Sequence, residues 1–323
     1  MIDRRRLLTA AGAAPMLGGG RAALAGPAPR DLNGVWTHAW YTRLERPRAF
    51  KALVATPAEA EAFEAPRRAH HGELIAKEDV LGQAESEFPD NGPGLARIRG
   101  EIRSSWIVDP PNGKIPWIQE ARHRLGIDDP DKESVANSLD NVETRPTDER
   151  CLTASGSGAP LLNSHDANVL QIVQTPDHVL IATENNHEVR IVRIGGPAPR
   201  PATPPSWWGV STGHWEGATL VVETSGLRAG VTKLNDELSL TDHSRVVERF
   251  TRTGPAEITY LFEVEDPTLF TRPWRGEMVF RPAPGIYEYA CHEGNYSLPG
   301  ILSAARQAER VSSANGNGAP PGR

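Results

Sequence analysis

The sequence predicts a mainly β protein in which an antiparallel meander of about ten strands closes into a barrel. Short runs of β-branched and aromatic residues follow one another from about residue 168 onward, and turn signals separate most of them. Strands joined by tight turns pair antiparallel, and a meander removes its exposed edges most simply by closing on itself. Helical segments are expected before this β region and after it.

The N-terminal part supplies one strand and a helical insertion. The first strand is expected within residues 31–40, "DLNGVWTHAW". Thr56 and Glu59 match a capping box, which predicts a helix start here, and residues 57–103 should be mostly helix and loop. Residues 104–150 are rich in proline, aspartate and asparagine without a sustained period, which predicts that they wrap the surface of a larger core.

Nine further runs predict the remaining strands: "NVLQIVQT", "HVLIATE", "HEVRIVRI", "GHW", "TLVVET", "RVVERFTR", "EITYLFEV", "GEMVFRP" and "IYEYAC". The proline-rich residues 197–205 are expected to connect two groups of strands, and residues 298–311 to form a C-terminal helix. A single domain would then cover residues 26–312, with the insertion at about 57–150 and a disordered tail at 313–323.

The first 25 residues are typical of an export signal. Arg4, Arg5 and Arg6 precede an apolar stretch of small residues that ends in the small-x-small sequence "ALA", a pattern that indicates a twin-arginine signal. The stretch is too short and too rich in glycine to span a bilayer, so no membrane insertion is expected. We therefore expect the twin-arginine export machinery as a partner and a periplasmic or secreted location.

The charge of the mature chain argues against two classes of partner. Residues 1–25 hold four of the 35 basic and one of the 41 acidic residues, so their removal leaves a net charge of −9. Such a protein repels the phosphates of nucleic acid and anionic membrane surfaces. Sequence motifs for nucleotide binding, for serine hydrolysis and for zincin chemistry are also absent.

The two cysteines, Cys151 and Cys291, predict a disulfide, because an even count in an oxidising compartment favours pairing. A loop of that length would restrict the unfolded chain by roughly 4–5 kcal/mol in the entropy model. The alternative is a catalytic or metal-bound thiolate at Cys291.

The run "ATENNHEVR" supplies the first candidate for chemistry. If Asn185 and Asn186 form a two-residue hairpin turn, Glu184 and His187 are directly opposed, with Cβ atoms roughly 4.5–5.5 Å apart. The carboxylate would then fix the histidine tautomer and raise its pKa, as a general base requires. The alternative is an exposed hairpin tip with an incidental ion pair. Arg190 is expected to face the other side of the strand.

The run "CHEGNY" supplies the second candidate. His292, Glu293, Asn295 and Tyr296 gather where the chain leaves the expected last strand, and barrel mouths are places where ligand sites form. Tyr296 would frame an aromatic substrate. The alternative is a hydrogen-bonded corner that fixes the last strand to the C-terminal helix.

Two more histidines are candidate substrate-binding residues, His165 in "SHDAN" and His214 in "GHWEG". Together with His187 and His292 they could hold a divalent metal, but no two of them have ligand spacing on one element. We therefore predict no cofactor and keep a metal ion as the alternative.

The loop "DPTLFTRPW" combines an acid, a base and aromatic residues. Arg272 is expected either to pair with Asp266 or to orient an anionic group of a substrate, on which Trp274 would stack.

Nine segments of the chain resemble, in this order, a family of exported bacterial proteins: "GVW", "SSWIVDPPNGKIPW", "ERCL", "QIVQTPDHVLI", "HEVRI", "GHWEG-TLVVET", "VVERFTR", "DPTLFTRPW" and "YACHEGNY". The resemblance covers roughly residues 31–310 and implies an exported globular domain that keeps the glutamate and histidine residues of the two candidate sites. It brings no activity with it. The two asparagines of "ENNH" depart from the apolar residues common there, and "GVW" resembles the Gly-x-Trp of lipocalin-like barrels.

These observations favour an exported enzyme that acts by acid–base chemistry, as a lyase or isomerase, on a small apolar or aromatic molecule in a barrel pocket. His187, oriented by Glu184, would remove a proton, and His292 or Glu293 would return one. A barrel of this type also serves as a carrier, so a periplasmic protein that binds hydrophobic ligands without turnover is the alternative. A metal-dependent hydrolase or oxygenase is the second alternative.

Overall fold

The computed structural model describes residues 30–76, 92–125, 141–145, 147–153, 156–164, 167–196, 206–228, 231–233 and 238–314. The expected export signal (1–25), the proline-rich connection (197–205) and most of the expected tail (315–323) lie outside these residues. Within the described residues, no helix has the length and apolar character needed to cross a membrane.

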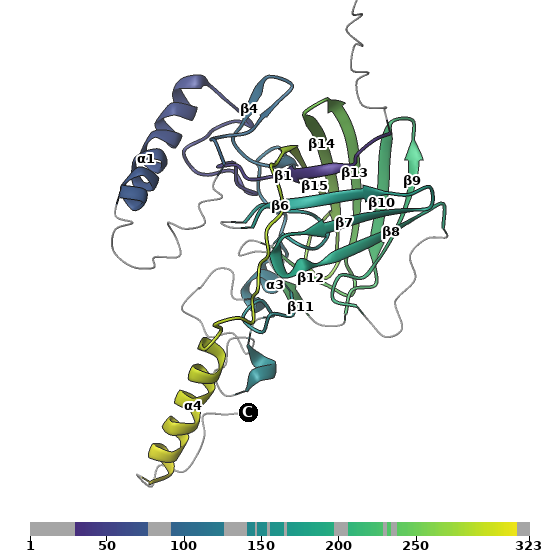
Figure 1. Cartoon of the computed structure of the whole chain (residues 1–323). Coiled ribbons are helices and arrows are strands. Elements are labelled where there is room, and N and C mark those ends of the chain that lie inside the picture. Colours follow the sequence, from purple (N-terminus) through teal and green to yellow (C-terminus); the bar gives the residue numbers. More distant parts are fainter. Residues whose placement is uncertain are drawn as a thin grey trace, which may run out of the picture.

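The protein is mainly β, and nine strands close into a barrel to which a tenth strand is added (Figure 1). The nine strands follow one another around the barrel in this order: β1 (Gly34–Thr37), β6 (Val169–Gln174), β7 (His178–Thr183), β8 (Val189–Ile194), β9 (Val210–Glu216), β10 (Thr219–Ser225), β13 (Arg245–Gly254), β14 (Glu257–Glu265) and β15 (Trp274–Pro282). β1 pairs with β6 on one side and with the end of β15 on the other, which closes the ring. β5 (Ile107–Asp109) pairs with the start of β15. The predicted barrel is confirmed.

Two features differ from the predicted antiparallel meander. β8 and β9 pair in parallel, so that Val192 lies opposite Ser211, because the chain returns to the same end of the barrel before β9 begins. Residues 286–291, where a strand was expected, form no ladder with any described strand. Their alternating aromatic residues satisfy strand propensity, yet β1 and β5 already occupy the available side of β15.

The N-terminal part forms a small unit beside the barrel. Helix α1 (Pro57–Ala76) begins with the predicted capping box: the Thr56 hydroxyl accepts the backbone N–H of Glu59 at 3.2 Å, and the Thr56 N–H donates to the Glu59 carboxylate at 2.8 Å. Strands rather than helix or loop occupy residues 97–103. The three-stranded sheet contains β2 (Val54–Ala55), β4 (Glu101–Arg103) and β3 (Arg97–Ile98).

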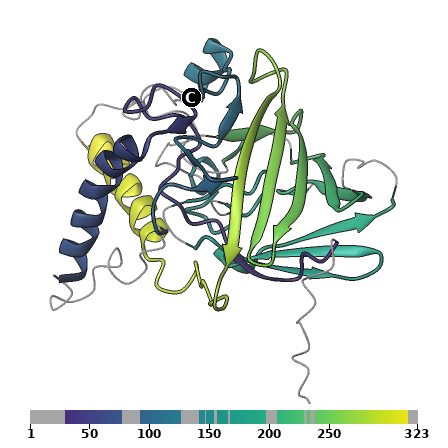
Figure 2. The ribbon, with the colours of Figure 1, turned by 90° about the horizontal axis from the view of Figure 1, so that it is seen from above.

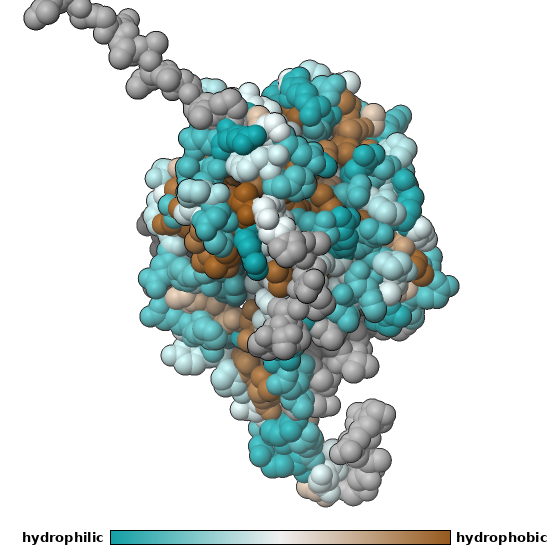
Figure 3. All heavy atoms as spheres, turned by 90° about the vertical axis from the view of Figure 1, so that its right-hand side faces the viewer, coloured by the Kyte–Doolittle hydropathy of each residue, from teal (hydrophilic) through white to brown (hydrophobic). Residues whose placement is uncertain are grey.

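The other short elements lie in connections. They are α3 (Gln119–Arg124), the 3-10 turns η2 (Val142–Thr144) and η3 (Asn185–His187), and the pair β11 (Val231–Lys233) and β12 (Ser239–Thr241). The predicted C-terminal helix is α4 (Ser297–Ala314), which ends three residues later than expected. Figure 2 shows α1 and α4 on the same side of the barrel. α4 projects from the body, and an apolar stripe runs along it (Figure 3).

The barrel interior is built from every second residue of its strands, as the two-residue period of a β-strand requires. On β14 the inward residues are Ile258, Tyr260, Phe262 and Val264, and each has no exposed surface. Aromatic rings form a continuous wall on this side: the Tyr260 and Phe280 rings stack with centroids 5.0 Å apart. The other inward-facing buried residues are mostly aliphatic, among them Leu170, Ile172, Val179, Ile181, Val192, Leu220, Val222, Val246 and Met278.

Each end of the barrel is covered. At one end Arg252 lies over the ring of Trp36, 4.9 Å from its centroid, and donates to the backbone carbonyl of Asp31. At the other end residues 156–162 enter the core, and Leu161 and Leu162 are almost completely buried. We call residues 156–162 the plug segment.

A prediction follows from Gly276, an inward position of β15. A Cβ atom there would lie 2.2 Å from the Phe262 ring, so the ring would have to move in a close-packed interior. We expect Gly276→Ala to lower the free energy of unfolding by about 1–3 kcal/mol in urea titration. Gly254→Ala is the matched control, because its Cβ meets only Glu257 at 3.7 Å. Equal effects of the two substitutions would contradict this packing.

Candidate functional site

The barrel interior contains a buried ion pair that crosses it from β8 to β13. The Arg190 guanidinium donates two hydrogen bonds to the Glu248 carboxylate, one of them from Nη2 to Oε1 at 2.9 Å. Both side chains are buried, while Ile191, the next residue on β8, points outward and is 58% exposed. At this point of β8 the alternation departs from hydropathy, because a charged residue occupies an inward position and an apolar residue an outward one. A charged side chain is tolerated at such a buried position only when it is paired and hydrogen-bonded.

Tyr260 joins this pair to the plug segment. Its hydroxyl donates to Glu248 Oε1 at 2.7 Å and accepts the backbone N–H of Leu161 at 2.9 Å. Burial raises the pKa of Tyr260 well above its usual range, and the negative charge of Glu248 raises it further. Burial acts to lower the pKa of Arg190, but the charge of Glu248 and its hydrogen bonds outweigh burial and raise it. The phenol is thus neutral and the guanidinium charged at any physiological pH.

A buried histidine, His38, has its imidazole on the aromatic wall. His38 directly follows β1, and the residue is 2% exposed. Its imidazole meets the Phe280 ring edge to face, with ring centroids 5.4 Å apart. Among the described residues neither His38 Nδ1 nor Nε2 has a hydrogen-bond partner. Burial lowers the pKa of His38 to about 4, and the backbone carbonyl of Asn168 beside the imidazole offsets part of this shift. The imidazole is therefore neutral at pH 7.

Two further hydrogen-bond donors of the barrel interior are also without a protein partner among the described residues. Within the described part of the chain, the indole N–H of Trp274 and the Nε–H of Arg190 are buried and have no acceptor. Trp274 is an inward residue of β15 and packs edge to face on Phe262, with ring centroids 5.7 Å apart. Most buried polar groups in folded proteins are paired with protein or with ordered water, and among the described residues these three groups have no protein partner.

The plug segment is fixed by hydroxyl groups at the barrel end. Ser157 is buried, and its hydroxyl donates to the carbonyl of Asn185 at 3.3 Å and accepts from Thr183 Oγ1 at 3.0 Å. Gly156 has φ +80°, and a Cβ atom there would lie 2.7 Å from the carbonyl oxygen of Leu162. The segment therefore folds back tightly on itself before it enters the core.

The predicted two-residue turn at "ENNH" is wrong, because the turn is longer. The last ladder bond joins the Thr183 N–H to the Glu188 carbonyl at 2.9 Å, and four residues connect the strands. Asn186 and His187 both have positive φ, 54° and 52°. Glu184 is buried and accepts the backbone N–H of Tyr287 at 2.9 Å, whereas His187 is exposed. The directly opposed strand pair expected from a tight turn is not formed.

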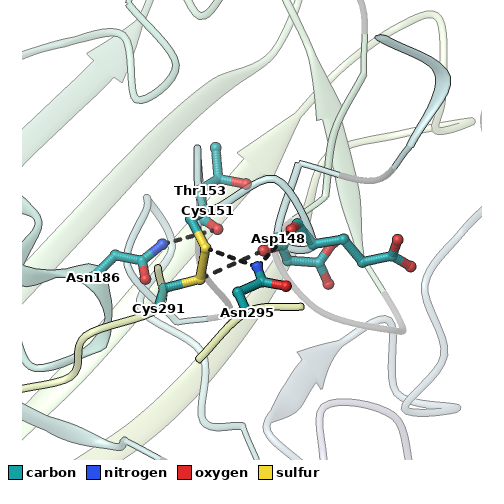
Figure 4. The surroundings of a disulfide bond; sticks show 7 residues. Asp148, Cys151, Thr153, Asn186, Cys291 and Asn295 are labelled. Carbon is teal, nitrogen blue, oxygen red and sulfur yellow. Dashed lines mark hydrogen bonds between the residues drawn. A yellow bond between two sulfur atoms is a disulfide. The ribbon is translucent and has the colours of Figure 1, made fainter. Parts of the chain in front are cut away.

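The predicted disulfide between Cys151 and Cys291 is present, with an S–S distance of 2.02 Å, so the thiolate alternative for Cys291 is wrong (Figure 4). Around it, Asn186 Nδ2 donates to the Thr153 carbonyl at 3.2 Å, and Asn295 Nδ2 donates to the Glu149 carbonyl at 3.3 Å. These contacts join three segments that are distant in sequence.

The disulfide corner therefore brings the two candidate sites of the sequence to one end of the barrel. His292 and Glu293 are exposed beside it, and Tyr296 is 83% exposed. The chain segments that carry the two candidate sites meet here, but both imidazoles are exposed rather than enclosed in the barrel. The side chain of Asn295 is used in fixing the corner.

The remaining predicted residues lie apart from this corner. His214 is exposed on β9 and pairs with Glu216 at 3.2 Å, and His165 lies outside the described residues. Arg272 pairs with Asp109 at 2.8 Å rather than with Asp266. Asp266 instead accepts hydrogen bonds from nearby hydroxyl groups of Thr241, Ser244 and Thr268. Trp274 is completely buried in the barrel core, and its stacking on a substrate stays a prediction.

Sequence analysis missed Arg190, Glu248, Tyr260 and His38, although a signal for two of them exists. In "RVVERFTR" Glu248 shares a face with Val246 and Phe250, and in "VRIVRI" Arg190 shares one with Val192 and Ile194. One acid and one base on otherwise apolar strand faces are a signature of an internal ion pair. His38 had no such signal.

Within the described residues no group of three or more His, Cys, Asp and Glu side chains is arranged to hold a metal ion. The disulfide is typical of a protein that folds in an oxidising compartment.

The structure thus defines a closed β-barrel with a polar, partly unpaired group of side chains inside an apolar and aromatic wall. Comparison with models of known protein families gives no match, and comparison with curated proteins gives none either. The resemblance to a family of exported bacterial proteins stays a prediction.

The first prediction from the site concerns the buried ion pair. Arg190→Met leaves the Glu248 carboxylate buried without its cation, and we expect it to lower the free energy of unfolding by about 3–5 kcal/mol in urea titration. Arg249→Met is the matched control, because Arg249 lies on the outer face and pairs with Glu216 at 2.6 Å at the surface, where such pairs contribute about 0–1 kcal/mol. Adding Glu248→Leu to Arg190→Met should restore part of the loss. Equal losses for Arg190→Met and Arg249→Met would contradict the assignment.

The second prediction concerns pH. The folded protein holds the pKa of His38 at about 4, below its ordinary value of 6.5, so the unfolded chain binds the proton first as pH falls. Stability is therefore fully present above pH 6.5 and is lost between pH 6.5 and 4, by up to about 3 kcal/mol from this residue. In urea titrations at pH 7, 6, 5 and 4, the free energy of unfolding should fall less steeply with pH in His38→Phe than in the wild type. His187→Phe, at an exposed histidine, is the control and should follow the wild type. Identical pH profiles for wild type and His38→Phe would refute the predicted contribution of His38 to the pH dependence of stability.

Proposed function

We propose that this protein is an exported binding protein that holds a small, largely apolar or aromatic molecule inside its barrel. The observation that carries the proposal is His38, a completely buried neutral imidazole with both ring nitrogens unpaired among the described residues. A buried polar group without a partner costs about 1–3 kcal/mol, and a ligand with a hydrogen-bonding group would remove that cost.

The surroundings of His38 support the kind of molecule proposed. Phe280 and Tyr260 provide stacked rings beside it, and the rest of the inward face is aliphatic or aromatic. Small-molecule sites are typically apolar and carry a few convergent polar groups that fix orientation. The interior has this composition, with the imidazole of His38 and the indole N–H of Trp274 as polar groups. Its inward side chains are packed without exposed surface, so a bound molecule would have to displace some of them.

A second function, acid–base catalysis as a lyase or isomerase, is supported by a different observation. The disulfide corner gathers the segments that carry Glu184, His187, His292 and Glu293 at one end of the barrel. A molecule released from the interior at that end would meet two imidazoles with carboxylates nearby, the groups that proton transfer requires. The outward direction of both imidazoles favours binding over catalysis.

The test uses the neutral fluorescent probe N-phenyl-1-naphthylamine with the mature protein. We expect saturable binding of about one molecule per chain, with energy transfer from tryptophan. Val192→Phe fills the interior and should weaken binding at least about tenfold, as extra volume in a close-packed site does. Ile191→Ser removes an exposed apolar side chain from the next position on the outer face and should leave binding unchanged.

The same experiment separates the two functions. A carrier returns its bound molecule chemically unchanged, and His187→Ala and His292→Ala keep affinity within a few fold. An enzyme yields a product by mass spectrometry, and both substitutions abolish it. Binding that is lost in Ile191→Ser and kept in Val192→Phe places the molecule on the outer surface and rejects the proposal.

A further inference from the structure

A second region of the protein holds an arginine without a counter-ion, beside the turn of residues 110–113. The backbone N–H of Arg46 donates to the Gly113 carbonyl at 2.8 Å, and the Gly113 N–H donates to the Pro110 carbonyl at 2.9 Å. Gly113 has φ +69°, and a Cβ atom there would lie 2.8 Å from Arg46 Cβ and 3.0 Å from Arg46 Cζ. The arginine side chain therefore lies directly against the turn, in space that glycine leaves open.

Arg46 has no partner for its charge. The residue is 7% exposed, and among the described residues its guanidinium has neither an ion pair nor a hydrogen bond. Its Nε is buried, whereas the two Nη groups do not belong to the buried unpaired nitrogens and so reach the surface. Burial lowers the pKa of Arg46, and no acidic side chain of the described residues offsets this shift. A guanidinium stays charged at pH 7 even so, and its Nη groups are open to an acceptor from solvent.

The carboxylates next to this turn are engaged with other groups. Glu45 pairs with Lys114 at 3.1 Å, and its second oxygen accepts a backbone N–H at 2.8 Å. Asp109, directly before the turn, pairs with Arg272 at 2.8 Å and with Arg275 at 3.2 Å. With Arg46 included, four cations and two carboxylates gather here, which leaves two positive charges on this surface of a chain whose net charge is −6.

We propose that this turn binds a phosphate group, with two phosphate oxygens on the Nη groups of Arg46 and with Lys114 as the second cation. The planar fork of an arginine matches two oxygens of one phosphate. A phosphate monoester carries about 1.5–2 negative charges at pH 7, which balances the local excess, whereas a carboxylate would leave one positive charge over. Binding also supplies the counter-ion that a largely buried charge requires. The proposal is independent of the binding function proposed for the barrel interior.

The experiment titrates the mature protein with methyl phosphate and, separately, with acetate at pH 7.5, and binding is read from the methyl proton line widths of each molecule. Sodium chloride at about 0.15 M screens long-range attraction between exposed charges, so that direct contacts decide the affinity. Methyl phosphate should half-saturate the protein at about 1 mM or below, as two charge-assisted hydrogen bonds allow. Acetate should bind at least about tenfold more weakly.

Three substitutions test the two cations. Arg46→Met should weaken methyl phosphate binding at least about tenfold, because both Nη donors are removed. Arg46→Lys keeps the charge but loses the fork, and it should weaken binding at least about threefold. Glu45→Gln frees Lys114 and keeps an acceptor for the backbone N–H, so it should strengthen binding about threefold.

Two controls accompany these variants. Arg193→Met removes one positive charge from an exposed position of β8 and should leave the affinity for methyl phosphate unchanged. The fold is checked by urea titration, where Arg46→Met should keep or raise the midpoint, because it removes an unpaired charge and leaves none behind.

A lipid headgroup and a soluble compound can both present such a phosphate, and vesicles distinguish the two sources. The protein is sedimented with phosphatidylcholine vesicles that contain or lack phosphatidic acid. Cosedimentation that requires phosphatidic acid and is lost in Arg46→Met identifies a headgroup. Methyl phosphate binding without cosedimentation identifies a soluble phosphate compound, which is the expected result because the negative net charge of the chain opposes an anionic surface.

Three outcomes would overturn the proposal. The first is the absence of saturable methyl phosphate binding to the wild type. The second is an equal loss of affinity in Arg46→Met and Arg193→Met, which would show a general effect of charge. The third is acetate binding as tight as that of methyl phosphate, which would show that the turn does not select a phosphate.

Discussion

Closure of the barrel depends on the backbone pairing of one four-residue strand. β1, Gly34–Thr37, pairs with β6 on one side and with β15 on the other, and this removes the edges that an open nine-stranded sheet would expose. The same strand also places two ring-bearing side chains in the interior. Trp36 points inward under Arg252, and the residue after the strand is His38, which reaches the aromatic wall because β1 brings it next to Phe280.

The interior combines two kinds of polar group with different consequences. Arg190, Glu248 and Tyr260 form a hydrogen-bonded set that spans three strands and holds the plug segment through the Leu161 N–H. Such a set favours one arrangement of the strands, because any other leaves charges unpaired in the core. His38 and the indole of Trp274 have no partner and make no such contribution. The first set therefore contributes to the stability and specificity of the fold, whereas the second does not.

Local signals in the sequence were sufficient for most of the architecture. The capping box at Thr56 and Glu59 forms as expected, the tight hairpin near Gly217 joins β9 to β10, and Cys151 pairs with Cys291. The capping box and the hairpin depend on residues that are close in sequence, and the disulfide follows from the presence of two cysteines. The alternation of most strands also predicts their inward faces correctly.

The wrong predictions share one cause. The local sequence allowed more than one conformation, and contacts with distant parts of the chain selected between them. Residues 286–291 have the composition of a strand, but the side of β15 they would use is taken. The "ENNH" turn could close after two residues or four, and buried contacts of Glu184 and Asn185 select the longer one. The polar interior was missed because the buried arginine and glutamate are 58 residues apart, and only the closed barrel makes them neighbours.

The disulfide places most of the barrel strands in a covalent ring. Its two cysteines are separated by 140 positions, and every strand from β6 to β15 lies between them, whereas β1 and β5 lie outside. A protease that cuts the chain once inside this ring leaves both fragments attached to each other through sulfur as well as through the sheet. The protein can thus be cut once in a connection between these strands without losing half of its barrel.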